Sequence, residues 1–341
     1  MEQSITIRVP GTSANCGPGF DTLGVACTIY NDLTLSLLHE PELTIEVEGE
    51  GAENIPCDAR NMVWRSIQLL LTRAHKEKEY RGAKIHMINR IPLSRGLGSS
   101  ASAIVSGIKA ANVLIGNHFS RAELLQIATE IEGHPDNVAP AIYGGFTISL
   151  MENHRAESFS FIPRIPLQLV VAVPDFPLST KAARKALPAQ VPIKDAVFNV
   201  GHSSMLVAAL IKGNVRFLRH VFEDSLHQPY RASLIPGMYD VFKAAKKAGA
   251  LGACISGAGP CLIAFTIEHC NKIADAMVKA FEKVNNVKVP YKIVKRRPGD
   301  IASCYADPTK AFEELGWKAT HGIEDMMRDS YNFILEQEKN K

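Results

Sequence analysis

A glycine- and serine-rich segment, Pro92 to Ala101, most constrains the fold of this chain, because it joins a strand-like run to a long helix. The run Lys84 to Asn89 precedes it, and a stretch of small residues from about Ser100 to Ile115 follows it. Glycines let a backbone approach an anion closely, and a helix N-terminus presents free amide groups and the positive end of its dipole. The segment therefore predicts a phosphate-binding turn, in which Ser99 and Ser100 can donate hydroxyl groups or reach Mg²⁺.

The segment by itself leaves an alternative open. It is not a Walker A loop, because neither GKS nor GKT occurs in it. An ordinary turn and helix cap would have the same composition. Two further loops favour the phosphate site: the polar stretch Pro10 to Asp21 after the first strand, and the glycine loop Ile255 to Pro260 between two strands.

Composition excludes several classes of function. The 341 residues are 46% hydrophobic and carry 38 Lys and Arg against 35 Asp and Glu, with no basic stripe, so nucleic-acid binding has no support. No apolar run approaches the roughly 18 residues of a membrane span. The seven cysteines are scattered without a CxxC pair, which favours reduced thiols. We expect a soluble, cytoplasmic protein that binds neither nucleic acid nor membrane.

The hydrophobic pattern predicts an α+β chain with a boundary near residue 160, where Pro163, Pro166 and Pro174 cluster. Predicted strands are 5–9, 33–38, 43–48, 84–89, 145–150, 168–173, 253–256, 261–265 and 287–294. Predicted helices are 61–74, 100–115, 120–132, 196–211, 215–222, 238–247 and 269–284. Ser120 and Glu123 form the pattern of a capping box.

The three loops, in this order and at this separation, resemble those of the GHMP kinases, over residues of about 5–290. Within that group the chain is similar to the homoserine kinases. The segments that carry this similarity are SANCGPGFDTLG (13–24), EGHPDNVAPA (132–141), STKAARKALP (179–188), and PYR with the following LIP (229–236). The resemblance implies an N-terminal ATP-binding domain like domain 2 of ribosomal protein S5 (1–160) and a ferredoxin-like C-terminal domain (161–294).

The resemblance also implies the ligands, which are ATP, L-homoserine and Mg²⁺, and a reaction in threonine biosynthesis. The implied ATP-binding residues are Asn61, near the adenine, and Pro92, Leu93, Ser94, Arg95, Gly96, Leu97, Gly98, Ser99, Ser100 and Ala101. The implied substrate-binding residues are Asn15, Asp21, His134, Thr180, Arg184, Arg231, Gly257 and Gly259. Because an amino acid is a zwitterion, Asp21 and Asn15 suit its ammonium group, and Arg184 and Arg231 suit its carboxylate.

The implied catalytic residues are Asn137, Glu132 and Ser100. Ser100 (or Ser99) and Glu132 would hold Mg²⁺, although Glu130 is an alternative ligand two residues away. Phosphoryl transfer depends mainly on positioning and charge neutralisation. We therefore expect direct in-line attack by the substrate hydroxyl, with Asn137 orienting groups and no strong general base.

Other interpretations remain open. Outside this family His134 would more often structure a loop, Arg184 and Arg231 would be solvated charges, and Asp21 would form a turn. The runner-up function is a GHMP kinase for a different alcohol. A catalytically silent protein that binds ATP or a UDP-sugar is a third option. The sequence also leaves a homodimer open.

The final segment, 295–341, departs from the family and is predicted to be a short helical appendage. Residues 296–308 and 314–319 resemble the C-terminal end of UDP-glucose 4-epimerase, a similarity that can be traced back to Pro290. In that family the residues matching Arg297 and Asp300 contact UDP. Because the N-terminus lacks a strand-GxxGxxG-helix unit, epimerase activity has no place in this chain. We favour an inert extension over a regulatory or oligomerisation element.

Overall fold

The computed structural model describes residues 3–289, which belong to one compact unit. The strands are β1 (Ser4–Ala14), β2 (Leu23–Leu38), β3 (Leu43–Gly49), β4 (Gly82–Asn89), β5 (Phe146–Glu152), β6 (Arg155–Phe161), β7 (Gln168–Ala172), β8 (Gly252–Ile255) and β9 (Leu262–Thr266). The helices are α1 (Met62–Arg73), α2 (Ser99–Leu114), α3 (Arg121–Glu132), α4 (Pro135–Tyr143), α5 (Thr180–Lys185), α6 (Ile193–Lys212), α7 (Val215–Leu218), α8 (Gln228–Arg231), α9 (Met238–Ala248) and α10 (Cys270–Asn285), with short 3-10 turns η1 (Ala52–Asn54) and η2 (Ala232–Leu234).

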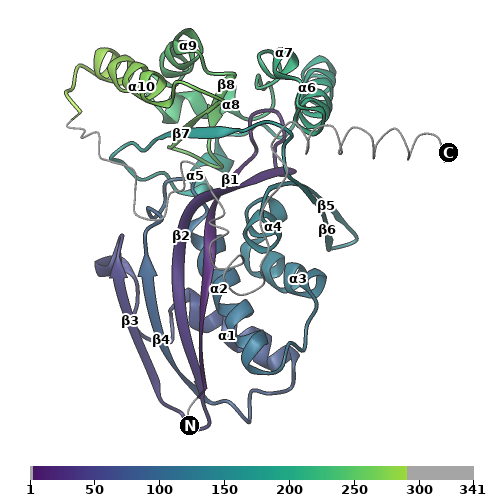
Figure 1. Cartoon of the computed structure of the whole chain (residues 1–341), viewed down its shortest axis with the longest axis vertical. Helices are drawn as coiled ribbons and strands as arrows, with labels where there is room; N and C mark the ends of the chain where they lie inside the picture. The colour runs from purple at the N-terminus through teal and green to yellow at the C-terminus, as the bar shows by residue number, and fades with distance from the viewer. Residues whose placement is uncertain (1–2, 290–341) are drawn as a thin grey trace, which may run out of the picture. The chain divides into compact units, whose positions relative to one another are not determined.

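The first sheet has six strands in the order β3-β4-β2-β5-β6, with β1 also paired to β2. Strand β2 is long enough to pair with β5 through Leu23–Val25 and with β4 through Asp32–Leu38. Helices α1 to α4 cover one face of this sheet (Figure 1). Leu35, Ile67 and Ile104 lie in the apolar core between the two layers, fully removed from water. Helix and sheet thus bury their apolar faces against each other.

The second sheet is antiparallel, in the order β7-β9-β8. Helices α9 and α10 lie beside it and pack against each other (Figure 1). Their apolar faces, which include Val241 and Ile273, share a core with Ile255 and Leu262 of the strands. This half carries the third glycine loop between β8 and β9.

A third apolar cluster joins the two halves of the molecule. Leu23 and Phe146 come from the first sheet, Leu206 comes from α6, and the stacked rings of Phe222 and Phe265 lie 4.5 Å apart between centroids. The predicted boundary near residue 160 falls between the two sheets, although this shared core leaves no polar gap there. The division into domains 1–160 and 161–294 stays a prediction.

The predicted α+β class is confirmed, as is the capping box of Ser120 and Glu123 on α3. Several local features differ from what the sequence suggested. The polar stretch that begins at Pro10 is still strand as far as Ala14, because a register shift between Pro10 and Thr12 accommodates the proline within the pairing to β2. The block HPDNVAPA forms α4 with Pro135 in its first turn, where a proline costs no hydrogen bond. Strand β6 was not predicted.

At the C-terminal end, the strand predicted for residues 287–294 is absent at 287–289, and the remainder lies outside the described residues. The helical appendage predicted for residues 295–341 also lies outside them. The helix predicted for 215–222 ends at Leu218.

Candidate active site

Two glycines determine the path of the segment that leads from β4 into α2. Gly98 is the N-cap of α2 with φ +67°, and a Cβ there would lie 2.0 Å from Thr12 Oγ1. Gly96 has φ +76°, and a Cβ there would lie 2.2 Å from the Ser256 carbonyl oxygen. Only glycine fits both positions. No side chain caps α2, so its first amide groups are left for a ligand.

Hydrogen bonds hold the three predicted loops together. The Thr12 amide donates to the Leu97 carbonyl at 3.0 Å, which joins the end of β1 to the segment before α2. The Ser256 hydroxyl donates to the Gly96 carbonyl at 2.6 Å, which joins that segment to the loop after β8. Parts of the chain that are distant in sequence therefore form one rim.

This rim borders a cavity of about 530 Å³. The predicted site residues that line it are Asn15, Asp21, Asn61, Leu93, Ser94, Arg95, Gly96, Gly98, Ser99, Ser100, Glu132, His134, Asn137, Thr180, Arg184, Arg231, Gly257 and Gly259. Pro92, Leu97 and Ala101 are outside the lining, and the last two are buried in the interior. The sequence interpretation missed Ala14, Asn31, Ile55, Pro56, Arg60, Met62, Val63, Met87, Asn89, Ala103, Asp136, Leu178, Ser179 and Ala258, many of which are direct neighbours of predicted residues.

One end of the cavity is bordered by apolar side chains near the start of α1. Asn61 caps this helix, because its Oδ1 accepts from the Val63 amide at 2.9 Å. Its Nδ2 donates to the Pro56 carbonyl at 2.7 Å. The side chain of Asn61 is thus occupied with holding Pro56 and Val63 in the lining beside Met87, an arrangement that suits a flat heterocycle.

Ser100 and Glu132 meet at the N-terminus of α2. The Ser100 hydroxyl donates to Glu132 Oε2 at 2.8 Å, and burial raises the pKa of Glu132. Glu130, the alternative ligand, instead forms an exposed ion pair with Arg73 at 2.5 Å and is not among the cavity-lining residues. A carboxylate and a hydroxyl beside a helix N-terminus are oxygen ligands suited to Mg²⁺.

Helix α4 brings two further polar groups to the cavity. Thr12 Oγ1 donates to Asn137 Oδ1 at 2.8 Å. The Nδ1 of His134 lies 2.5 Å from Asp136 Oδ1. Burial disfavours the charged imidazole, but the hydrogen bond and the charge of Asp136 outweigh burial and raise the pKa of His134.

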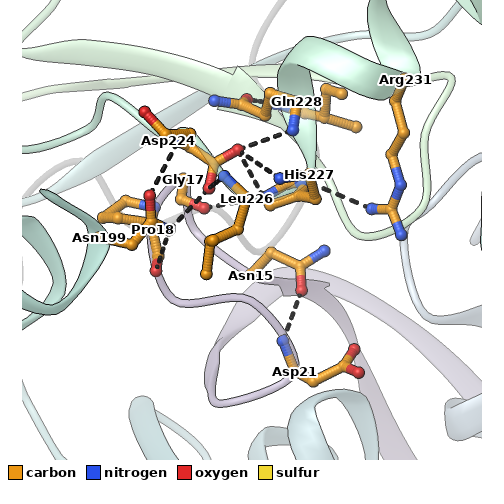
Figure 2. A network of polar contacts seen from close by, with 12 residues as sticks. Asn15, Gly17, Pro18, Asp21, Asn199, Asp224, Leu226, His227, Gln228 and Arg231 are labelled. Atoms are coloured by element: carbon orange, nitrogen blue, oxygen red, sulfur yellow. Dashed lines mark hydrogen bonds and ion pairs between the residues drawn. The ribbon is translucent and has the colours of Figure 1, made fainter. Parts of the chain in front are cut away.

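At the other end of the cavity, Asp21 and Arg184 form a pair with two hydrogen bonds. Nη2 of Arg184 donates to Asp21 Oδ1 at 2.8 Å and Nη1 donates to Oδ2 at 3.0 Å, and the hydrogen bond to Asp21 raises the pKa of Arg184. Asn15 Oδ1 accepts from the Asp21 amide at 3.0 Å (Figure 2). The Asn15 Nδ2 donates to the Gly257 carbonyl at 2.7 Å.

Arg231 lines the same end and is only 2% exposed. The Phe20 ring lies beside both guanidinium groups, with its centroid 5.3 Å from Cζ of Arg231 and 5.8 Å from Cζ of Arg184. The cavity thus combines an anion-binding helix terminus with a cluster that contains two guanidinium groups and one carboxylate. Such a cavity can hold a phosphate donor and a small zwitterion together.

The fold and this site define the chain as a GHMP kinase. The model of the GHMP kinase N-terminal domain matches residues 61–145, and the model of the GHMP kinase C-terminal domain matches residues 206–283. The predicted GHMP kinase fold is confirmed. Phosphomevalonate kinase from Streptococcus pneumoniae, in a complex with phosphomevalonate and AMPPNP, shares this fold at 14% identity and a TM-score of 0.63.

The chain belongs to the homoserine kinase family. It is 44% identical over 295 residues to the homoserine kinase of Carboxydothermus hydrogenoformans, covering 86% of this chain and 94% of that protein. The homoserine kinase of Gloeobacter violaceus is 46% identical over 77% of this chain and 88% of its own length. The crystal structure of homoserine kinase from Cytophaga hutchinsonii superposes with a TM-score of 0.76 at 35% identity, over 84% of this chain and 92% of that one.

Two further findings concern the C-terminal segment and the possibility of a membrane-spanning helix. A model of GDP-mannose 4,6 dehydratase matches residues 261–330, in agreement with the resemblance of the tail to a nucleotide-sugar epimerase. Within residues 3–289, no helix is both long and apolar enough to cross a lipid bilayer.

Proposed function

We propose that this chain transfers the γ-phosphate of ATP to the side-chain hydroxyl of L-homoserine, giving O-phospho-L-homoserine and ADP. The main support is that the uncapped N-terminus of α2 and the Arg184 and Arg231 guanidinium groups border one cavity. Relatives that are named homoserine kinases match most of the chain. The finer assignments of residues below belong to this proposal.

The substrate carboxylate would lie against Arg184 and Arg231, and its ammonium group against Asp21 and Asn15. In the ligand-free protein Arg184 is paired with Asp21. The side chains of this pair are 39% and 37% exposed, so a zwitterion can exchange with the pair at small cost. Two guanidinium groups for one carboxylate favour an amino acid over a neutral alcohol.

The geometry supports transfer without a strong general base. The Asn137 side chain is an amide, so it cannot take up a proton at neutral pH, and its oxygen already accepts from Thr12. The homoserine hydroxyl oxygen would attack the γ-phosphorus in line while the bond to the ADP oxygen breaks. The hydroxyl proton would leave to a phosphate oxygen or to water. The amide groups at the start of α2 would stabilise the phosphate charge.

The Ser100 and Glu132 side chains fit a magnesium ion. The half-buried Glu132 carboxylate makes its hydrogen bond to the neutral Ser100 hydroxyl, and a divalent ion would suit this pair of oxygen ligands. In the described part of the chain no group of three or more acidic, histidine or cysteine residues forms a ligand cluster, so the ATP phosphates would complete the coordination. Held by Ser100 and Glu132, Mg²⁺ would supply positive charge that offsets the negative charge of the phosphates during transfer. Glu132 is favoured over Glu130, which is held by Arg73.

ADP release with Mg²⁺-ATP tests the proposal, with L-homoserine, mevalonate, galactose and shikimate as acceptors. We expect turnover with L-homoserine only. Glu132→Ala should abolish it, whereas the matched variant Glu130→Ala, two residues earlier on the same helix, should keep it. Turnover of a different alcohol would overturn the substrate assignment. Equal losses in both glutamate variants would overturn the metal site.

The role of Asn137 has a separate test. Asn137→Asp should not accelerate turnover, because positioning and charge neutralisation already supply the catalysis. A strong increase in kcat together with a new acidic limb in the pH profile would show that a base is advantageous here.

The homodimer and the cytoplasmic location stay predictions.

A further inference from the structure

Asp224 organises a buried turn that leads through His227 to Arg231, one of the cavity-lining residues (Figure 2). Its side chain is fully buried. Its Oδ2 accepts from the amides of His227 at 3.0 Å and Gln228 at 2.7 Å, and its Oδ1 accepts from the Leu226 amide at 3.1 Å and from Asn199 Nδ2 at 2.7 Å. Four donors satisfy a carboxylate that would otherwise be costly to bury. The backbone around His227 is therefore fixed.

The same turn is attached to three other parts of the molecule. Asn199 on α6 donates to the Pro18 carbonyl at 3.0 Å and accepts from the Ser225 amide at 2.8 Å. The Gln228 Oε1 accepts from the Ile255 amide at 2.8 Å, at the end of β8. The position of the turn is thus set by α6, β8 and the loop that precedes Asp21.

The hydrogen bonds of His227 define its tautomer. Its Nε2 lies 2.8 Å from the Gly17 carbonyl, which can only accept, so Nε2 carries the proton. Its Nδ1 lies 3.2 Å from Arg231 Nη1, which can only donate, so Nδ1 is the acceptor. Burial lowers the pKa of His227, in agreement with a neutral ring, and the ring stacks on Phe20 at 5.2 Å between centroids.

Three acceptors hold Nε and Nη1 of the Arg231 guanidinium group. Nε donates to the Ala183 carbonyl at 3.3 Å, and Nη1 donates to the Gly257 carbonyl at 3.1 Å as well as to His227. All three acceptors are neutral. Nη2 makes no hydrogen bond to the residues that the structure describes, and Arg231 lines the cavity. Nη2 is therefore the nitrogen left for a carboxylate ligand.

We propose that His227 is a positioning residue for substrate recognition, which accepts from Arg231 Nη1 and so presents Nη2 to the carboxylate of the amino-acid substrate. Asp224 supports this arrangement by holding the backbone of His227, and its Oδ2 also lies 3.6 Å from Nε2 of the ring. This inference rests on the proposed function and deepens it. If His227 were purely structural, replacing it would destabilise the fold and weaken the binding of any substrate, with or without a carboxylate. If it positions Arg231, replacing it should weaken only the binding of a substrate that has a carboxylate.

Two variants of His227 separate these roles. In His227→Asn the amide oxygen can replace Nδ1 and accept from Arg231, but the contact to Gly17 is lost. In His227→Gln the amide nitrogen can replace Nε2 and donate to Gly17, but the acceptor for Arg231 is lost. We expect His227→Gln to raise KM for L-homoserine roughly tenfold or more, and His227→Asn to stay within about threefold of the wild type.

Two controls accompany this comparison. KM for ATP should be unchanged in both variants. KM for 3-aminopropan-1-ol, which is homoserine without its carboxylate, or its inhibition constant where turnover is slow, should also be unchanged. The proposal would be overturned if His227→Gln weakened the binding of the amino alcohol as much as that of L-homoserine. It would also be overturned if KM for L-homoserine rose as much in His227→Asn as in His227→Gln.

The tautomer has a readout independent of activity. In ¹⁵N-labelled wild-type protein at pH 7.5, the ring of His227 should show a protonated Nε2 and an unprotonated Nδ1, and a proton on Nδ1 would overturn the orientation argued here. Lack of L-homoserine turnover by the wild type is a different failure. That result would refute the proposed function and, with it, the claim that Arg231 binds the substrate carboxylate. The ¹⁵N spectrum would still show whether His227 accepts from Arg231.

Discussion

Replacing Gly98 by alanine tests whether the turn before α2 needs the geometry described above. At φ +67° an alanine costs about 1–2 kcal/mol of backbone strain. The added Cβ would lie 2.0 Å from Thr12 Oγ1, so this oxygen must move by roughly 1 Å or more. The movement breaks its hydrogen bond to Asn137, a further loss of about 1 kcal/mol.

Gly116→Ala is the matched control. Gly116 also has a positive φ, +88°, but a Cβ there meets no atom within 4 Å. It should lose only the strain, about 1–2 kcal/mol, or roughly 2–3 °C in Tm, and keep full activity. Gly98→Ala should lose about 2–3 kcal/mol and about a hundredfold in kcat/KM, because displacement near 1 Å disturbs the reacting geometry.

Thermal unfolding and ADP release with Mg²⁺-ATP and L-homoserine measure the two effects. If Gly98→Ala and Gly116→Ala had the same Tm and the same kcat/KM, the close contact with Thr12 would have no consequence. The argument for glycine at the phosphate turn would then be refuted.

Three further predictions concern other parts of the molecule. Arg184→Lys should raise KM for L-homoserine about tenfold with little change in KM for ATP, because a lysine cannot form two parallel hydrogen bonds; steady-state kinetics decide this. Hydrogen bonds from Arg8, and less so from Arg90, lower the pKa of Asp32 in the folded protein. The ionised Asp32 therefore stabilises the fold above its unfolded pKa of 3.8, and this stabilisation is lost as pH falls through the lower, folded pKa. Asp32→Asn should therefore lower the free energy of unfolding by about 1 kcal/mol at pH 7 and by progressively less as the pH falls below 3.8. Urea titrations that give the same loss throughout this pH series would contradict this. Removing residues 295–341 should leave turnover of L-homoserine unchanged, since residues 1–289 form a compact unit, and a clear drop in kcat would assign the tail a role.

Much of the candidate site was predictable from the sequence because its residues lie in short segments with distinctive chemistry. The turn before α2 needs glycine at 96 and 98, and a Gly-x-Gly pattern in front of a helix is visible without a structure. Two arginines and one aspartate likewise suggest a zwitterion pocket once the resemblance to homoserine kinases is considered. Their placement in one cavity depends on the fold.

The rest depended on distances that the sequence does not contain. His227 lies two positions before Pro229 and belongs to no motif of known chemistry, and only the structure brings its ring to Gly17 and Arg231. Helix α4 was missed because Pro140 in its interior argues against a helix, although a helix this short can tolerate the lost hydrogen bond. Strand β6 was missed because its mixed composition does not indicate a strand, and its extended conformation depends on the pairing with β5.

The hydrogen bond from Asn15 to the Gly257 carbonyl has a consequence for biosynthesis of the protein. It spans 242 residues of sequence, and the Ser256 hydroxyl reaches back to Gly96 in the same way. During translation the N-terminal part of the chain leaves the ribosome first, without its partners. The rim of the cavity closes only after residues 256 and 257 have emerged, so a nascent or prematurely terminated chain has no complete active site and cannot consume ATP through it.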